Sequence, residues 1–315
     1  MAAGHAILGA FIAVMLVVGA NAAGLLDRSG GGGNAASFDF GSGGGAASGT
    51  GSTTTRPADG SAPTSAAGAS TTVAGSSTTV SPASSVPADA GKVPTAADPA
   101  RVLIVGDSDA GNLGPPLETT LADTGVVKSQ LFYKVSSGLT RPDFFDWPAK
   151  LQQAVPQFTP DIVVVTFGGN DAQDVTLGGK SYPVQTDEWK AEYARRVGAV
   201  MDYLSAEGRT LVWVGIPNAK SGDFRDRLDI LQQVTKAEAA KRPAVKYVDT
   251  WNRFVGASGG YADYIIDPRD RQGKLVRADD GFHLNQVGAE ILAIDVARVV
   301  IDELIARGAA VTPLS

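Results

Sequence analysis

The C-terminal two thirds of the chain alternates short apolar runs with longer stretches in which apolar and polar residues mix. The apolar runs, each typical of a strand, lie at 102–105, 126–135, 162–167, 210–216 and 245–248. Helices are predicted at 115–123, 151–158, 187–207, 224–241 and 285–307, and the three-to-four spacing of apolar residues is clearest at 187–207. Strands that are apolar on both faces and alternate with helices indicate a parallel sheet covered by helices on both sides.

The predicted fold class is therefore α/β, with three α/β/α layers and a central parallel sheet of about five strands. The folded domain is expected to span residues 99–315, a length that suits a single domain. In such sheets, ligands bind outside the carboxyl ends of the strands. Residues that directly follow a predicted strand are therefore the first candidates for a functional site.

The N-terminal stretch carries no charged residue at positions 2–26, and Ile7 to Val18 is strongly apolar. About 20 apolar residues cross a bilayer, so residues 1–28 are predicted to be a membrane anchor or a signal segment. The A-N-A sequence at 20–22 resembles a signal-peptide cleavage site. The return of leucine at 25–26 favours an uncleaved apolar helix instead. Both alternatives export the rest of the chain.

Residues 29–98 consist almost entirely of Gly, Ala, Ser, Thr and Pro. Such a composition buries too little apolar surface to offset the entropy lost on ordering, so this segment is predicted to be a disordered linker. A flexible chain of this length has a root-mean-square span of about 45–50 Å, which is enough to hold a domain off a membrane.

The composition removes several classes of function. The chain has no cysteine, which excludes disulfides, thiol catalysis and cysteine-bound zinc. The net charge of -6 argues against nucleic acid as a partner. No G-x-x-x-x-G-K-[ST] phosphate loop is present, and only one of the two histidines lies in the predicted domain, the other being His5. Neither a cofactor nor a catalytic metal is therefore expected.

Two segments carry the residues that a serine nucleophile needs. The G-D-S sequence at 106–108 directly follows the first predicted strand, which would leave Ser108 exposed at the strand end. In the D-G-F-H sequence at 280–283, Asp280 and His283 are three residues apart, so the carboxylate can orient the imidazole as a general base. Taken alone, the first segment is equally typical of a helix-capping turn and the second of a surface histidine in an acidic loop.

Two further segments offer hydrogen-bond donors to an oxyanion. The G-G-N-D sequence at 168–171 follows the third predicted strand, and Asn170 provides a side-chain amide. A donor of this kind contributes about 3–4 kcal/mol when it stabilises a developing oxyanion. Gly138, after the second predicted strand, offers a backbone N–H. Each segment is also compatible with an ordinary glycine turn.

In their order and placement, these segments resemble the conserved blocks of the SGNH (GDSL-type) hydrolase superfamily. Ser108 matches the nucleophile, Gly138 the glycine block, Asn170 the asparagine block, and Asp280 and His283 the final D-x-x-H block. The resemblance covers the whole predicted domain and neither the linker nor the apolar segment. It implies a flavodoxin-like α/β/α domain.

The chain departs from this superfamily directly after the G-D-S motif, where the usual leucine is Asp109. An acid beside the nucleophile can repel an anionic oxyanion or pair with a nearby cation, and the sequence leaves both open. The segments at 136–147 and 167–173 look like the DUF459 type of bacterial envelope protein. The assignment of Gly138 depends most on that likeness.

The resemblance implies an extracytoplasmic serine esterase with a triad of Ser108, His283 and Asp280, and with the N–H groups of Ser108 and Gly138 and the Asn170 amide in the oxyanion hole. Expected substrates are O-acyl, in particular O-acetyl, esters of envelope carbohydrate, or small esters. One alternative is an O-acetyltransferase with the same triad, with a membrane O-acyltransferase as a possible partner. Another is a non-catalytic envelope-binding module. The expected location is the cell membrane, with a single pass, or the exterior after signal cleavage.

Two smaller expectations concern the surroundings of the site. Phe144, Phe145 and Trp147 either line a substrate wall or pack in the core. A His283 with an ordinary pKa would make activity rise around pH 6–7.

Overall fold

The computed structural model describes residues 92–314. The predicted N-terminal helix and most of the predicted linker lie outside these residues. No helix between residues 92 and 314 is long and apolar enough to span a bilayer.

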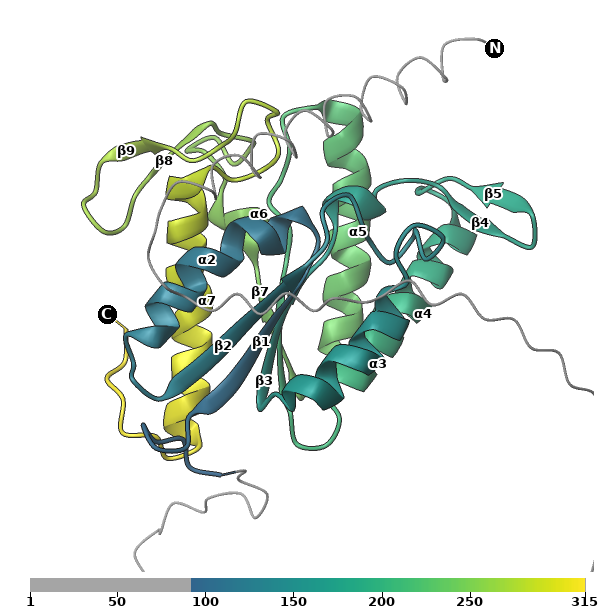
Figure 1. Cartoon of the computed structure of the whole chain (residues 1–315). Coiled ribbons are helices and arrows are strands. Elements are labelled where there is room, and N and C mark those ends of the chain that lie inside the picture. The colour runs from purple at the N-terminus through teal and green to yellow at the C-terminus, as the bar shows by residue number, and fades with distance from the viewer. Residues whose placement is uncertain (1–91, 315) are drawn as a thin grey trace, which may run out of the picture. The chain divides into compact units, whose positions relative to one another are not determined.

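A five-stranded parallel sheet forms the centre of the domain, as the apolar runs predict (Figure 1). Its strands are β1 (Ala100–Gly106), β2 (Val127–Tyr133), β3 (Ile162–Thr166), β6 (Thr210–Val214) and β7 (Val245–Val248). The spatial order β2-β1-β3-β6-β7 places the first strand inside the sheet. This is the order of a flavodoxin-like doubly wound sheet, in which the crevice for ligands lies at the ends of β1 and β3.

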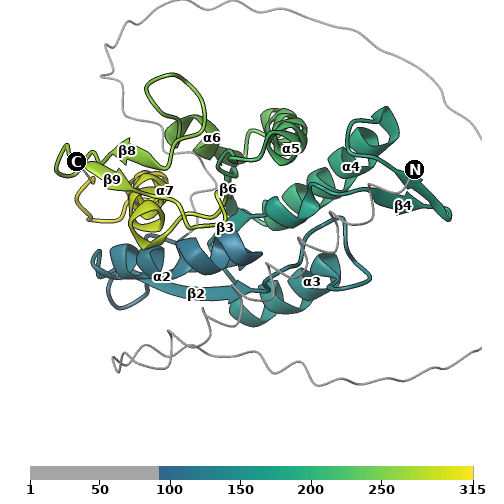
Figure 2. The ribbon, with the colours of Figure 1, turned by 90° about the horizontal axis from the view of Figure 1, so that it is seen from above.

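Helices cover both faces of the sheet (Figures 1 and 2). One face packs against α2 (Ser108–Ala122) and α7 (Gln286–Ala306). The other packs against α3 (Trp147–Phe158), α4 (Asp187–Leu204) and α5 (Gly222–Ala240). Successive strand residues point to opposite faces, so Val102 and Ile104 of β1 join the first core while Leu103 and Val105 join the second.

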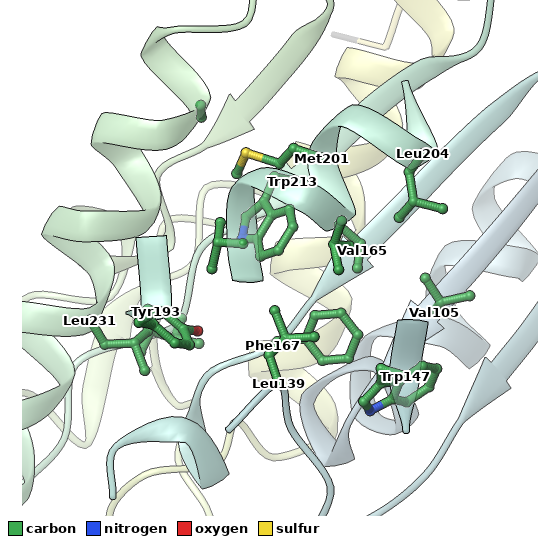
Figure 3. Packing of buried hydrophobic residues seen from close by; sticks show 14 of the residues in the cluster. Val105, Leu139, Trp147, Val165, Phe167, Tyr193, Met201, Leu204, Trp213 and Leu231 are labelled. Carbon is green, nitrogen blue, oxygen red and sulfur yellow. The ribbon is translucent and has the colours of Figure 1, made fainter. Parts of the chain in front are cut away.

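Aromatic side chains fill much of the core beneath α3 and α4. Figure 3 shows Phe167, just past β3, between Trp147 and Trp213. Its ring centroid lies 4.9 Å from that of Trp147 and 6.1 Å from that of Trp213. Tyr193 stacks on Trp189 at 4.8 Å. These rings bury the segment that leads from β3 into the G-G-N-D sequence and thereby limit its movement.

Short elements that the apolar pattern does not predict complete the domain. They are the 3₁₀ turn η1 (Gly169–Asp171), the hairpin β4–β5 (Val175–Leu177 and Lys180–Tyr182), helix α6 (Thr250–Arg253) and the hairpin β8–β9 (Tyr264–Ile266 and Gly273–Leu275). Figure 2 shows the β8–β9 hairpin beside α7.

Helix α2 corrects the sequence prediction at its start. The pattern places the first residue at Pro115, which suits an N-terminal helix position, but the helix begins at Ser108 and runs through both prolines. Close packing on β2 explains the difference. A Cβ at Gly114 would lie 2.5 Å from Leu131, and one at Gly111 would lie 2.7 Å from Tyr133. These glycines have low helix propensity, but they let the helix approach the sheet.

Gly106, the last residue of β1, is required by both its conformation and its surroundings. Its φ is 153°, and a Cβ would lie 2.0 Å from the carbonyl oxygen of Thr166 on β3. We expect Gly106→Ala to lower the free energy of unfolding by about 3 kcal/mol or more, because the backbones must separate. Urea titration of the full chain, followed by tryptophan fluorescence, measures this. Gly125→Ala is the control: φ is 70°, but no atom lies within 4 Å of the added Cβ, so only about 1–2 kcal/mol is expected.

Candidate active site

Ser108 lies where β1 passes into α2, at the carboxyl edge of the sheet. The strand ends at Gly106 and the helix begins at Ser108 itself, so the serine is held by the first turn of the helix. Asp107 caps this helix by accepting a hydrogen bond from the backbone N–H of Asp109 at 3.0 Å. Ser108 is half-buried and is therefore accessible from the edge.

The Asp107 carboxylate also ties β1 to β3. Its second oxygen accepts a hydrogen bond from the backbone N–H of Gly168, at 3.1 Å. Asp107 is fully buried, and burial raises its pKa well above the ordinary value, with the charge of Asp109 adding to the rise. The sequence shows this residue as part of the G-D-S motif but does not reveal that it links the serine turn to the G-G-N-D turn.

The structure brings Ser108, His283 and Asp280 into one chain of hydrogen bonds. The hydroxyl oxygen of Ser108 lies 2.8 Å from Nε2 of His283, although the residues are 175 positions apart. Nδ1 of His283 lies 2.5 Å from Oδ2 of Asp280. Oδ1 of Asp280 accepts the backbone N–H groups of Phe282 and His283, at 2.9 and 3.0 Å. The carboxylate thus fixes both its own loop and the imidazole, which supports the predicted orientation.

The D-G-F-H loop reaches this position through a turn at Gly281 and a close contact at Phe282. Gly281 has a φ of 70°. The Phe282 ring lies over Gly169, where an added Cβ would be 2.6 Å from the ring. His283 is only 5% exposed. After the loop, Asn285 caps α7 by accepting a hydrogen bond from the N–H of Gly288 at 3.0 Å.

A buried arginine supports the same loop, and sequence reasoning did not identify it. Arg277 is 2% exposed and donates to the carbonyl oxygen of Phe282 at 2.8 Å and to Oδ1 of Asn218 at 2.7 Å. Its guanidinium lies 5.0 Å from the ring centroid of Tyr261. Within residues 92–314, no carboxylate lies within ion-pair distance of it. Burial lowers the pKa of Arg277 to about 10, which leaves a cation behind the loop at neutral pH.

Asp171 connects the segments that contain the two candidate oxyanion-hole residues, Gly138 and Asn170. One Asp171 oxygen accepts both the backbone N–H and the hydroxyl of Thr140, at 2.8 and 2.9 Å, and the other accepts the hydroxyl of Tyr193 at 3.1 Å. Gly138 packs against the same carboxylate, since an added Cβ would lie 2.2 Å from Oδ1. Asp171 thereby links the segment after β2 to the segment after β3, the two strands that flank β1.

Asn170 presents a donor that nothing in the described protein uses. Its Nδ2 is buried and has no hydrogen-bond partner among residues 92–314. The main-chain carbonyl of Asn170 accepts a hydrogen bond from Gln173, which holds the turn. A buried amide donor without an acceptor costs about 1–3 kcal/mol. Asn170 follows β3 at the same edge of the sheet at which Ser108 follows β1, so a ligand oxygen bound at this edge would supply the missing acceptor.

The environment of His283 strongly favours its protonated form. Burial acts to lower the pKa of His283, but the hydrogen bond to Asp280 and the negative charges of Asp109 and Asp280 outweigh burial and raise it to about 9. The expectation of a rise in activity around pH 6–7 assumed an unperturbed imidazole and is corrected by these contacts. The same contacts hold the pKa of Asp280 below its ordinary value, against the effect of burial.

The aromatic residues near Gly138 divide between core and surface. Trp147 is fully buried and donates from Nε1 to the hydroxyl of Ser137 at 2.8 Å. Phe145 packs on it with ring centroids 4.9 Å apart. Only Phe144 is exposed, at 48%. Core packing is therefore the role of two of these three residues. Between residues 92 and 314, no group of three or more His, Cys, Asp or Glu side chains is placed to hold a metal ion.

Solved structures with a similar backbone include a lipase/acylhydrolase from Enterococcus faecalis, with 18% identity, coverage of 69% of this chain and 99% of that chain, and a TM-score of 0.49. Another is an acetylxylan esterase from Geobacillus stearothermophilus, with 16% identity, coverage of 66% and 94%, and a TM-score of 0.46. None of the curated proteins matches. The family model described as a protein of unknown function, DUF459, matches residues 101–299. This match spans more than half of the 315 residues, so the chain belongs to the DUF459 family.

Proposed function

We infer that the domain is a serine esterase whose nucleophile is Ser108. One observation carries this inference: the hydroxyl of Ser108 lies 2.8 Å from Nε2 of His283, whose Nδ1 is 2.5 Å from Asp280. A nucleophile, a base and a group that orients the base are the elements of triad chemistry. The order of the Ser108, Gly138, Asn170 and His283 segments resembles that of SGNH hydrolases and agrees with this function.

In the first half of the reaction, Nε2 of His283 accepts the Ser108 proton while Oγ forms a bond to the ester carbonyl carbon. The carbonyl oxygen becomes an oxyanion, for which Asn170 Nδ2 and the backbone N–H groups of Ser108 and Gly138 are the candidate donors. The imidazolium then gives its proton to the leaving alkoxide. The C–O bond of the ester breaks, and the acyl group stays on Ser108.

In the second half, His283 takes a proton from water, and the hydroxide oxygen attacks the acyl carbon. Collapse of the second tetrahedral intermediate breaks the bond to Ser108, which recovers its proton from His283, and a carboxylic acid leaves. Asp280 remains ionised throughout and stabilises the imidazolium that forms twice per turnover. No cofactor is needed for these steps.

The substrate class follows from where the domain would work. The apolar stretch at residues 1–28 supports a single-pass anchor with the domain extracytoplasmic, and the composition of residues 29–98 supports a long tether. An esterase held in this way would meet O-acetylated envelope carbohydrate, which is the substrate class we propose. Separation of membrane and secreted fractions from cells that express the full chain, with detection of the domain, tests the anchoring.

Labelling with a fluorophosphonate probe tests the proposed nucleophile. Ser108 Oγ should displace fluoride and become phosphonylated in the wild-type chain, whereas Ser108→Ala should carry no label, because the probe requires an activated serine. Gel fluorescence and mass spectrometry of the modified peptide provide the measurement. Ser221→Ala is the matched control, since Ser221 is exposed and makes no side-chain capping bond, and it should label like wild type. An unlabelled wild-type chain would contradict the proposal and leave a binding module.

A further inference from the structure

Asp109 directly follows the nucleophile, and one of its two carboxylate oxygens points into the protein. Its carboxylate oxygen Oδ2 is buried and has no hydrogen-bond partner within residues 92–314. A buried, unpartnered carboxylate oxygen is costly, and a leucine at this position would avoid the cost. The proposed reaction assigns no task to this residue.

Helix α2 faces the D-G-F-H loop at two points, on either side of Asp109. Ser108 bonds to His283 at 2.8 Å, and Nδ2 of Asn112 donates to the carbonyl oxygen of Leu284 at 3.3 Å. Asp109 lines a small cavity together with Asn112, Leu284 and Pro217. Asp109 therefore lies between the two contacts that α2 makes with the segment that carries the base.

Two basic and two acidic side chains interact electrostatically with Asp109. Burial raises the pKa of Asp109, and the opposite charges of His283 and Arg277 lower it, while Asp280 adds to the rise. Asp107, one residue before Ser108, is the other acidic neighbour. The sequence leaves open whether this acid repels an oxyanion or interacts with a cation, and these opposite charges favour the second alternative without a direct ion pair.

We propose that Asp109 is a positioning residue that acts, together with Asp280, as a second carboxylate stabilising the imidazolium of His283. This deepens the proposed esterase function and rests on it. Asp280 approaches the ring through Nδ1. Asp109 acts through space from the first turn of α2, directly after the serine that is hydrogen-bonded to Nε2. The buried cation of Arg277, behind the loop, offsets part of the negative charge that the two carboxylates concentrate there.

Asp109 affects the pH range in which His283 is deprotonated and can act as a base. With Asp109 present, the imidazolium is stabilised, so His283 stays protonated to higher pH and the reaction is biased towards alkaline conditions. Without it, a larger fraction of the imidazole is free at neutral pH, but the imidazole is a weaker base. Asp109 therefore lowers the rate at neutral pH and raises the maximal rate at alkaline pH.

A simpler role for Asp109 is to complement the dipole of α2, where it lies in the first turn. That role affects the stability of the helix but does not require an effect on the titration of His283. The buried orientation of Oδ2 favours the interaction with His283 over the dipole role, because an exposed carboxylate would interact with the helix dipole equally well. A titration of His283 itself separates the two.

The experiment is an NMR titration of the histidine side chains in the full chain, which contains only His5 and His283. The signal that is absent from the spectrum of His283→Ala is assigned to His283. The wild-type pKa of His283 is expected near 9. Asp109→Leu and the isosteric Asp109→Asn should each lower it by about one unit or more, which corresponds to about tenfold more free base at pH 7. Asp279→Asn, which removes an exposed acid next to Asp280, should shift it by less than about 0.3 units.

Kinetics of p-nitrophenyl acetate hydrolysis provide the second readout. The pH profiles of kcat/KM for wild type and Asp109→Leu should cross, with the variant faster at pH 7 and slower on the alkaline plateau. A loss at every pH with an unchanged His283 pKa would overturn the proposal in favour of a structural role. The titration does not require catalytic turnover, so the two proposals fail separately. A wild-type protein without esterase activity would reject the proposed function. An unchanged pKa of His283 in the Asp109 variants would reject the role of Asp109.

Discussion

Ser108→Ala and His283→Ala should each lower kcat for p-nitrophenyl acetate hydrolysis by about 10⁴-fold or more, with little change in KM. The hydroxyl and Nε2 are 2.8 Å apart and act as one unit, so the loss of either partner removes the acyl-enzyme route. For the same reason the double variant should be no slower than either single variant. The measurement is best made near pH 9, where about half of His283 is expected to be free base, with the rate of spontaneous hydrolysis subtracted.

Two controls make this result specific to the triad. Ser221→Ala removes an exposed hydroxyl far along the chain and should keep wild-type kinetics. Thermal unfolding of each variant verifies that the fold survives, since Ser108 is half-buried and its truncation leaves no large cavity. If Ser108→Ala retained the wild-type rate, ester hydrolysis by this chain would have to use another group and the proposed nucleophile would be wrong.

The central sheet is predictable because its strands are buried on both faces. Each parallel strand reads as an apolar run, and the five runs correspond to the five strands of the observed sheet. Helix α2 was predicted only from Pro115 because Gly111, Gly114 and the prolines oppose a helix locally. Contacts with β2 decide its start, and a local pattern carries no information on them. The β4–β5 and β8–β9 hairpins are too short to leave a periodic signal.

The sequence motifs predict the main residues of the candidate site, but not the residues that hold them in place. Ser108 and Asn170 follow predicted strands and His283 precedes the last predicted helix, so a parallel sheet is expected to place them at one edge. Arg277 has no motif around it, and only the folded chain shows its 2% exposure and its bond to Phe282. The pKa of His283 is raised by the hydrogen bond to Asp280 and by the charge of Asp109, and the packing of α2 against the segment that carries His283 brings Asp109 close. Electrostatics of this kind depend on tertiary burial, so a sequence pattern cannot supply them.

The second large effect is expected at Asn170, where activity and stability should move separately. Asn170→Ala should lower kcat about 10²- to 10³-fold with KM nearly unchanged, because the amide stabilises an oxyanion that exists only in the transition state. In the resting protein, Nδ2 is buried without an acceptor. Its removal therefore relieves a desolvation cost of about 1–3 kcal/mol, and the free energy of unfolding should stay the same or rise.

Asn252 serves as the matched control, for which we expect a change in stability without a change in activity. Its Nδ2 already donates to Oδ2 of Asp249 at 2.7 Å, and it lies on α6, past the end of β7. Asn252→Ala should lower the unfolding free energy by about 1 kcal/mol and leave kcat unchanged, because a satisfied surface bond is lost and no oxyanion is involved. Urea titration and steady-state kinetics on both variants measure the two quantities. An Asn170→Ala variant that unfolds more easily but keeps its kcat would assign Asn170 to the structure of the turn and remove it from the oxyanion hole.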